Sequence, residues 1–287
     1  MIPPFQYKIP KNLQEACELL WDYREKAKVI AGGTDLIIAL RNGLLRPEVL
    51  IDITHLSELR KIEERDGIIS IGGAVTHSEI SSSPIIRTYG RILSEAASQI
   101  GSPQIRNTGT IGGNIVNASP AADTLPPLMV LEAMGKVVSK EGEKEVPIDS
   151  LIQGPYRSTL LPHEILVSIS IKKLHPHMKE SFIRLARRDG MAIARMSIAV
   201  LLQREGNRMK EVRISVGAVT PTPQRMKEAE SLLEDQPFDL ERLRVASEKI
   251  SSEMVLRSGV RPSTSYKSPV VKALVMRAIQ QAFENRQ

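Results

Sequence analysis

The chain has 287 residues, of which 41% are hydrophobic and 3% aromatic, and its formal net charge is +6. This length and hydrophobic fraction predict two domains with full cores. The few aromatic residues, and the mixing of basic with acidic residues, argue against a nucleic-acid partner.

The termini and the cysteine content narrow the class further. The N-terminus has no signal-peptide pattern and no apolar run is long enough to span a bilayer, so we expect a cytoplasmic protein without a membrane span. Cys17 is the only cysteine in the sequence, which excludes an internal disulfide and a four-thiolate iron–sulfur or zinc site.

Helical and extended patterns alternate from the N-terminus. Residues 11–27 have the apolar spacing of an amphipathic helix, in which Cys17 is predicted to be a buried small hydrophobe. Residues 28–45 predict a short strand, a glycine turn and a second helix. Further strands are predicted at 48–53 and 67–75.

The middle of the chain combines helix signals with a long stretch rich in glycine and proline. Thr76 and Glu79 have the spacing of a capping box at a helix start, and a helix is predicted around 91–100. Residues 110–128 then contain a glycine pair and three prolines beside one charged residue, which is typical of a ligand-binding loop. Residues 164–171 alternate as an edge or half-buried strand does.

A change of composition at 175–179 predicts a boundary before a second unit. Strands are predicted at 194–203 and 211–219, followed by helices. The last helix is expected to start with Ser268 as N-cap and Pro269 in its first turn. Its predicted apolar face consists of Val271, Leu274, Val275, Ala278, Ile279, Ala282 and Phe283. Strands mixed with helices, without regular alternation, indicate an α+β fold.

Two glycine-rich segments are candidate anion sites, "VIAGGTDL" at 29–36 and "GTIGGN" at 109–114. Neither matches the dinucleotide G-x-G-x-x-G pattern, and the sequence has no G-x-x-x-x-G-K-[ST] phosphate loop. Backbone amides in such turns form nests that suit a pyrophosphate. Ordinary tight turns are the alternative interpretation.

A family resemblance follows from the order of five segments: "AGGTDL", "IGGAVTHSEI", "IGSPQIRNTGTIGGNIVNASPAADTLPPLMVLEA", "YRSTLLPHEILVSISI" and "SVGAVTPTPQR". The chain resembles the FAD-binding medium subunit of the molybdenum hydroxylases, the family of xanthine dehydrogenase and carbon monoxide dehydrogenase. The resemblance implies a two-part FAD-binding domain of the vanillyl-alcohol-oxidase-like (PCMH) type at 1–175, with sub-parts at about 1–55 and 56–175. A smaller α+β C-terminal domain is implied at 179–287.

The resemblance also implies a set of cofactor-binding residues. The first pyrophosphate loop would be formed by Ile30, Ala31, Gly32, Gly33, Thr34, Asp35 and Leu36. Thr110, Gly112, Gly113 and Asn114 would form the second loop, which reaches the diphosphate and the ribityl chain. Asp123 would accept hydrogen bonds from sugar hydroxyls, with a helix N-cap as its alternative role. Leu166 would pack near the isoalloxazine ring, and Arg184 would be a basic residue near the flavin, where the family often has lysine.

Other side chains separate possible chemistries. Thr34 stands where some relatives in the wider flavoprotein superfamily carry a histidine that bonds covalently to FAD, so noncovalent FAD is expected. His77 is a candidate base, but its place in the capping box favours a role at the helix start. His175 and His177 are predicted to be solvated linker residues. We assign no catalytic residue and no metal ligand to this chain.

The implied function is electron transfer within a heterotrimer. A large subunit with the molybdenum cofactor and a small subunit with [2Fe–2S] clusters would be the partners, and FAD on this oxidoreductase subunit would pass electrons to an external acceptor. The acceptor is left open among NAD, a quinone, ferredoxin and oxygen. A standalone flavin oxidase and a non-redox binding protein that kept the fold are the alternatives.

Overall fold

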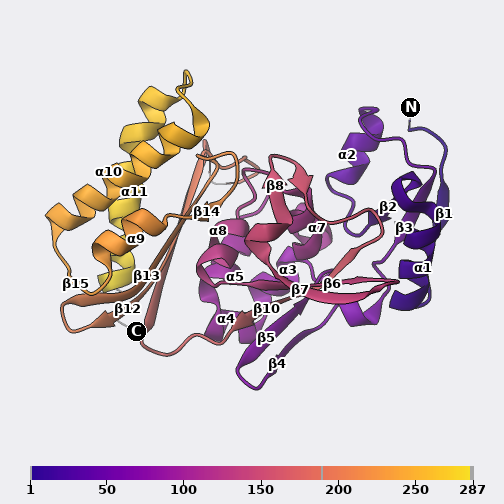
Figure 1. The fold of residues 1–287 in the computed structure, drawn as a ribbon, viewed down its shortest axis with the longest axis horizontal. Helices are drawn as coiled ribbons and strands as arrows, with labels where there is room; N and C mark the ends of the chain where they lie inside the picture. The colour runs from indigo at the N-terminus through magenta and orange to yellow at the C-terminus, as the bar shows by residue number, and fades with distance from the viewer. Residues whose placement is uncertain (1, 189, 285–287) are drawn as a thin grey trace.

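The structure is a computed structural model that describes residues 2–188 and 190–284. The chain builds three main β-sheets one after another along the long axis of the molecule, with the N-terminal sheet at one end and the C-terminal sheet at the other (Figure 1). No helix in the described part of the chain has the length and apolar character needed to cross a membrane.

The N-terminal unit is a three-stranded parallel sheet in the order β1-β3-β2. Its elements are β1 (Gln6–Lys8), α1 (Leu13–Tyr23), η1 (Arg24–Lys26), β2 (Ala27–Ile30), α2 (Leu36–Arg41), β3 (Val49–Asp52) and η2 (Ser57–Leu59). Asn12 caps α1 by accepting a hydrogen bond from the Glu15 amide. Cys17 is buried in the core of this unit, so both the first helix and the burial of its cysteine are confirmed.

The central sheet has five antiparallel strands in the order β4-β5-β10-β6-β7. These strands are β4 (Ile62–Arg65), β5 (Ile68–Gly72), β6 (Met134–Ser139), β7 (Gly142–Pro147) and β10 (Ile165–Lys172). Residues 164–171 were predicted to form an edge or half-buried strand; the edge position was wrong, because β10 lies in the middle of the sheet, while its isoleucines are buried and its serines partly exposed. Its neighbours β5 and β6 come from distant parts of the sequence, so local alternation could not reveal them.

Helices connect β5 to β6 and cover this sheet. They are α3 (His77–Ser82), α4 (Pro84–Tyr89), α5 (Arg91–Ser98), α6 (Pro103–Thr108), α7 (Ile111–Asn117) and α8 (Leu125–Val130), and η3 (Ile148–Leu151), β8 (Ile152–Gly154) and β9 (Arg157–Ser158) follow β7. The capping box of Thr76 and Glu79 at the start of α3 is confirmed. The glycine- and proline-rich stretch 110–128 is not one loop, because α7 and most of α8 occupy it.

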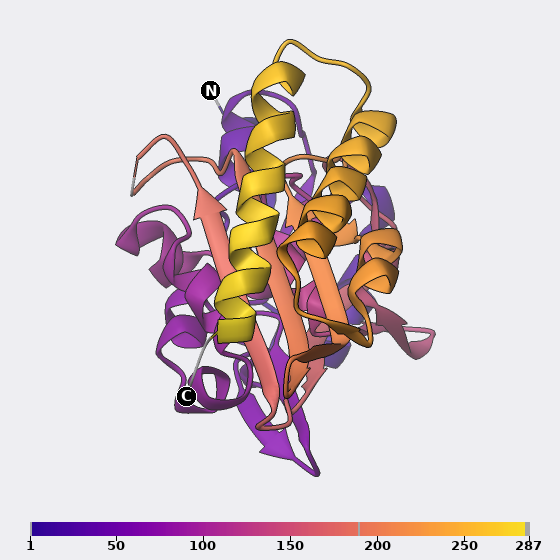
Figure 2. The same cartoon turned by 90° about the vertical axis from the view of Figure 1, so that its left-hand side faces the viewer.

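The C-terminal unit is an antiparallel sheet with one short and two long helices on one face. Its elements are β11 (Met178–Leu185), β12 (Met196–Glu205), β13 (Arg208–Gly217), β14 (Gln224–Arg225), α9 (Lys227–Leu233), β15 (Gln236–Pro237), α10 (Leu240–Ser258) and α11 (Thr264–Glu284). In Figure 2, α10 and α11 lie side by side across this face. Ile198 and Val200 of β12 pack toward these helices, whereas Ala199 and Leu201 pack with α5 and α8 on the other face. Both faces of the sheet are therefore covered.

The start of α11 differs from the prediction. The helix begins at Thr264, so Pro269 lies inside it and Ser268 is not its N-cap. Pro269 removes one amide whose acceptor would be the carbonyl of Ser265, an exposed residue that water can solvate. Ser268 instead contacts the hydroxyl of Ser251 on α10 at 2.7 Å. The predicted apolar face of α11 is confirmed in full.

A carboxylate joins the C-terminal sheet to the central helices and makes stability depend on pH. Glu180 on β11 accepts a hydrogen bond of 3.1 Å from the amide of Ile92 in α5. Burial and, to a smaller extent, the nearby charge of Glu95 raise the pKa of Glu180 to about 7, against the lowering effects of the Ile92 amide and Arg91. The folded state therefore disfavours ionisation of the Glu180 carboxyl. The stability that the protonated carboxyl contributes is fully present below its ordinary pKa of 4.5 and is lost as the pH rises through about 7.

We expect Glu180→Gln, which keeps the acceptor oxygen, to be more stable than the native chain at pH 8 and equally stable near pH 4. One pKa unit corresponds to about 1.4 kcal/mol, so the difference at pH 8 should reach roughly 3 kcal/mol. Urea unfolding of both proteins across this pH range measures it. A difference that stays constant with pH would contradict the raised pKa.

Candidate functional site

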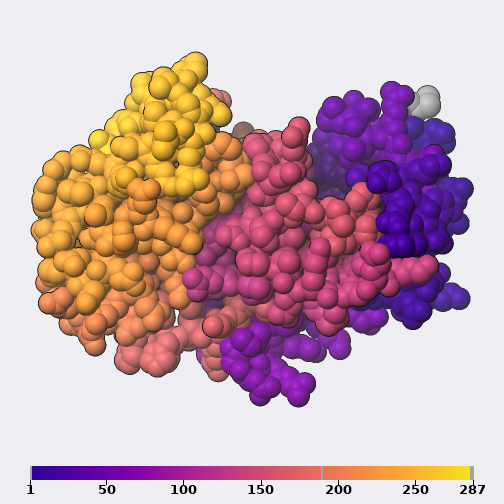
Figure 3. Space-filling model, in the orientation of Figure 1, coloured from indigo at the N-terminus to yellow at the C-terminus, as the bar shows by residue number. Residues whose placement is uncertain are grey.

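A cavity of about 440 Å³ opens between the N-terminal unit and the central sheet. Figure 3 shows the cleft between the segment that holds α2 and the segment around residues 150–160. Of the predicted cofactor-binding residues, the cavity lining includes Ala31, Gly32, Gly33, Thr34, Asp35, Leu36, Thr110, Gly112, Gly113, Asn114 and Leu166. The structure thus brings together the two glycine segments, which are about 80 residues apart in the sequence.

The first glycine segment is a turn between β2 and α2 with free backbone donors. Gly33 has a φ of +66°, a left-handed conformation that favours glycine. Within residues 2–188 and 190–284, none of the amides of 32–35 donates a hydrogen bond to the protein. Several free amides on one short segment of a cavity wall can bind an anion without a charged side chain.

Two of the glycines are required by backbone packing rather than by the cavity. An added Cβ at Gly32 would lie 2.1 Å from the carbonyl oxygen of Thr108, and one at Gly112 would lie 2.6 Å from that of Gly73. No side chain fits at either place, because real Cβ atoms do not approach backbone this closely. These residues hold the two glycine segments and β5 in close contact.

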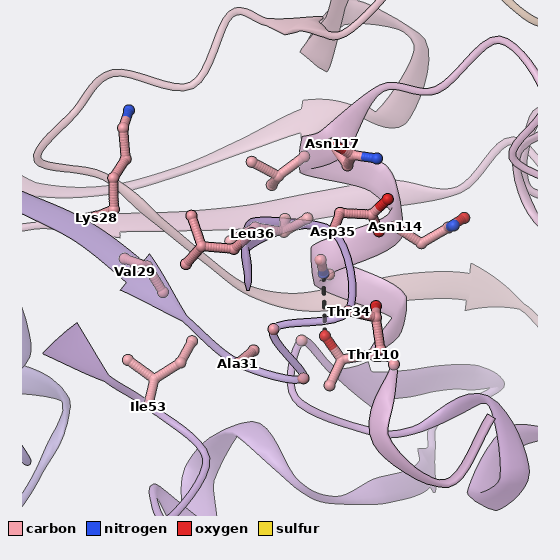
Figure 4. A pocket seen from close by; sticks show the side chains of 18 of the residues that line it. Lys28, Val29, Ala31, Thr34, Asp35, Leu36, Ile53, Thr110, Asn114 and Asn117 are labelled. Carbon is pink, nitrogen blue, oxygen red and sulfur yellow. Dashed lines mark hydrogen bonds between the residues drawn. The ribbon is translucent and has the colours of Figure 1, made fainter. Parts of the chain in front are cut away.

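The second glycine segment is the first turn of α7, where a loop was predicted. The Thr110 hydroxyl caps the helix by accepting a hydrogen bond of 3.1 Å from the Gly113 amide (Figure 4), and the Gly112 amide donates to Gly73. These amides are therefore already used and differ from the free amides of the first segment. An added Cβ at Gly113 would meet only the Thr110 hydroxyl, at 2.9 Å, so this glycine leaves the cavity wall open.

Polar side chains complete the wall beside α7. Asn114 Oδ1 accepts a hydrogen bond of 2.6 Å from the hydroxyl of Thr124, which leaves the Asn114 Nδ2 donors for the cavity. Figure 4 shows Thr34, Asp35, Asn114 and Asn117 on one side of the site and Lys28 and Val29 on the other.

Asp123 and Arg184 lie outside the cavity lining and form a buried ion pair. Arg184 Nε donates to Asp123 Oδ2 at 2.7 Å, and a second guanidinium nitrogen donates to the carbonyl of Ala192. Burial raises the pKa of Asp123, while the ion pair acts against that shift. Oδ1 of Asp123 is buried and has no hydrogen-bond partner among the described residues. The alternative role of Asp123 as an N-cap was wrong, because Thr124 is the N-cap of α8.

Two more predicted residues, Ile30 and Leu166, make packing contacts inside the protein. Ile30 is the last residue of β2 and does not line the cavity; its side chain packs beneath Gly33. Leu166 does line it, but its side chain also packs in the core, where an added Cβ at Gly135 would meet Leu166 Cδ1 at 2.9 Å. Leu166 thus contributes both to the hydrophobic core and to the cavity wall.

Several lining residues were missed by sequence reasoning. Lys28 on β2 and the buried Glu164, which accepts from Lys144 Nζ and the Leu161 amide, supply charges at the cavity. His77 begins α3, as the capping box indicated, and also borders the cavity. Lys28 directly precedes the first glycine segment, and Glu164 directly precedes β10. Their position next to motif residues in the sequence could have indicated that they line the cavity.

Comparison with protein families and known proteins adds to this geometry. Residues 3–173 match the FAD binding domain in molybdopterin dehydrogenase, and residues 181–282 match the CO dehydrogenase flavoprotein C-terminal domain. The chain belongs to the molybdopterin dehydrogenase FAD-binding family. The predicted family, the α+β fold class and FAD as cofactor are confirmed, and the chain is an oxidoreductase subunit.

Relatives of this family resemble the chain over nearly its whole length. It is 32% identical over 284 residues to the carbon monoxide dehydrogenase medium chain of Hydrogenophaga pseudoflava, covering 99% of each. It is 32% identical over 278 residues to the xanthine dehydrogenase FAD-binding subunit of Escherichia coli O157:H7, covering 96% of this chain and 95% of the relative. The structure of carbon monoxide dehydrogenase from Hydrogenophaga pseudoflava lacking the Mo-pyranopterin moiety superposes with a TM-score of 0.92 at 31% identity, covering 98% of both chains.

Proposed function

We propose that this chain binds FAD noncovalently in the cavity and passes electrons from the [2Fe–2S] clusters of a small partner subunit to an external acceptor. A large subunit with the molybdenum cofactor would complete the heterotrimer. The free amides of residues 32–35 in the cavity wall carry the proposal, because they offer hydrogen-bond donors to a pyrophosphate.

The residues around the cavity fit FAD. The open wall at Gly113 leaves room beside the amides, and Asn114 offers donors to the same space. Asp123 lies outside the cavity lining, so its contact with a ribityl or ribose hydroxyl stays a proposal; the support for it is the buried Oδ1, an acceptor without a partner among the described residues. Thr34 lines the cavity with a hydroxyl, which supports noncovalent binding.

FAD, once bound, supplies two-electron and one-electron redox chemistry, while the chain supplies position and electrostatics. Lys28 and Glu164 are the charged side chains that the cavity offers besides Asp35. Among the described residues, no cluster of three or more histidine, cysteine, aspartate or glutamate side chains is arranged to hold a metal ion. We assign the molybdenum cofactor and the iron–sulfur clusters to partner subunits on the basis of the family resemblance.

FAD binding is tested by titrating the purified full chain with FAD and following the visible flavin band and the quenching of flavin fluorescence. We expect one FAD per chain, released on denaturation without a covalent adduct. A folded chain that binds no FAD, alone or in its complex, would overturn the proposal.

The subunit role is tested by affinity purification of the tagged chain from its native cells, followed by measurement of molybdenum and iron in the purified sample. We expect molybdenum and iron to be present in fixed molar ratios to the chain. A chain that purifies without them and oxidises a substrate alone would be a standalone flavin oxidase. In a second step, the co-purified iron–sulfur subunit is reduced chemically, freed of reductant and mixed with the FAD-loaded chain, whose flavin band should bleach.

A further inference from the structure

His77 occupies the junction between the two glycine segments. Its amide donates a hydrogen bond of 3.0 Å to the carbonyl of Gly109, beside a β-bridge between Thr76 and Thr110. An added Cβ at Gly109 would lie 3.3 Å from the His77 ring and 3.5 Å from the hydroxyl of Thr34. The imidazole therefore lies against the same backbone that lines the proposed pyrophosphate site.

The ring is buried, yet its hydrogen-bonding capacity is not used by the protein. His77 is only 2% exposed and lines the cavity. Nδ1 is buried and has no hydrogen-bond partner among residues 2–188 and 190–284. A helix-start role requires only the backbone of His77, since the capping bonds belong to Thr76 and Glu79. No hydrogen bond to the described part of the protein therefore explains why a histidine side chain occupies this position.

The ring is neutral and has a definite proton position. Burial and the nearby charge of Arg106 on α6 lower the pKa of His77 to about 4. In a neutral ring one nitrogen carries the proton and the other accepts. A proton on the buried Nδ1 would create an orphaned donor, which is rarer in proteins than an orphaned acceptor. We therefore assign the proton to Nε2, because Nδ1 is the ring nitrogen that is fully buried without a partner, and His77 lines the cavity.

We propose that His77 donates a hydrogen bond from Nε2 to a phosphoryl oxygen of the dinucleotide and thereby positions its pyrophosphate. This inference rests on the proposed FAD binding and names a residue of that same site. The neutral ring adds one hydrogen-bond donor to the free amides of 32–35. Because it lies between the two glycine segments, it favours ligands that carry a phosphate at this position.

The test compares three ligands with the full chain: FAD, ADP and riboflavin, which has no phosphate. His77→Leu should weaken FAD and ADP binding by about tenfold or more, because a hydrogen bond to a charged acceptor is lost, and should leave riboflavin binding unchanged. His77→Gln keeps a donor and should stay within about threefold of the native chain. Ile80→Val, a buried change on the same helix away from the cavity, is the control and should leave all three affinities unchanged.

Each outcome separates this inference from the proposed function. A native chain that binds FAD, with His77→Leu binding ADP as tightly as the native chain, overturns the role of His77 alone. An equal loss for ADP and riboflavin also overturns it, since that result would reflect general distortion. A folded native chain that binds neither FAD nor ADP overturns both proposals.

A measurement on the native chain covers the case in which His77→Leu does not fold. With ¹⁵N-labelled histidine, and the His77 signals assigned by comparison with His77→Gln, ADP should shift the Nε2 resonance of His77. Riboflavin should leave it in place. A His77 resonance that does not respond to ADP would overturn the proposal.

Discussion

Gly113→Trp is expected to abolish FAD binding while the chain remains folded. An added Cβ at Gly113 meets only the Thr110 hydroxyl, and Gly113 lines the cavity, so we expect the indole to fill the space proposed for the cofactor. Disturbing the Thr110 cap costs the fold about 1 kcal/mol. We expect FAD affinity to fall by more than about 100-fold, which corresponds to about 2.7 kcal/mol, measured by fluorescence quenching.

The matched control is Gly154→Trp. Gly154 lies on β8, does not line the cavity, and has open space where a Cβ would be added. This variant carries the same new side chain and should bind FAD as the native chain does. If Gly113→Trp retains native FAD affinity, the cofactor does not occupy the cavity beside α7.

Removing Asp123 is expected to destabilise the chain by roughly 3–5 kcal/mol, because Asp123→Ala leaves the guanidinium of Arg184 buried without its carboxylate. Arg184→Met should cost less, since burial already raises the pKa of Asp123 and a proton can neutralise the carboxylate that remains. The double variant Asp123→Asn with Arg184→Met should recover part of the loss. Urea unfolding of these proteins without FAD measures all three values.

An exposed ion pair provides the comparison for this prediction. Lys26 and Glu48 are 3.1 Å apart with side chains more than half exposed, and Glu48→Ala should cost less than about 1 kcal/mol. If Asp123→Ala lowers the free energy of unfolding no more than Glu48→Ala does, the ion pair of Asp123 and Arg184 does not stabilise the contact between β11 and the FAD-binding part of the chain.

The sequence predicted the local elements well where their causes were local. The cap of Thr76, the buried face of α11 and the turn at Gly33 each depend on neighbouring residues, and each was found. The second glycine pair was predicted to form a loop because residues without a Cβ suit a site where backbone amides meet a ligand. Glycine also disfavours helices by about 1 kcal/mol per residue. Burial of Ile111 and Ile115 outweighs that preference and makes α7 a helix.

What the sequence could not predict depends on contacts between distant segments. The position of β10 between β5 and β6 is a tertiary pairing, and the use of the α7 amides follows from the approach of Gly73. The contact of Asp123 with Arg184 joins residues 61 apart. His77 lines the cavity only because α3 packs under the second glycine segment.

The sheet with two covered faces has a consequence for recombination between relatives. Phe182, Ala199 and Leu201 belong to the same hydrophobic core as residues of α5 and α8, so the two matched regions are not independently packed modules. A chimaera joined in the short segment between residues 173 and 181 would set one parent's side chains against another's across this shared core. Exchange of C-terminal halves would succeed only where these interfacial volumes are exchanged together, so the two halves of the subunit are expected to be inherited as one unit.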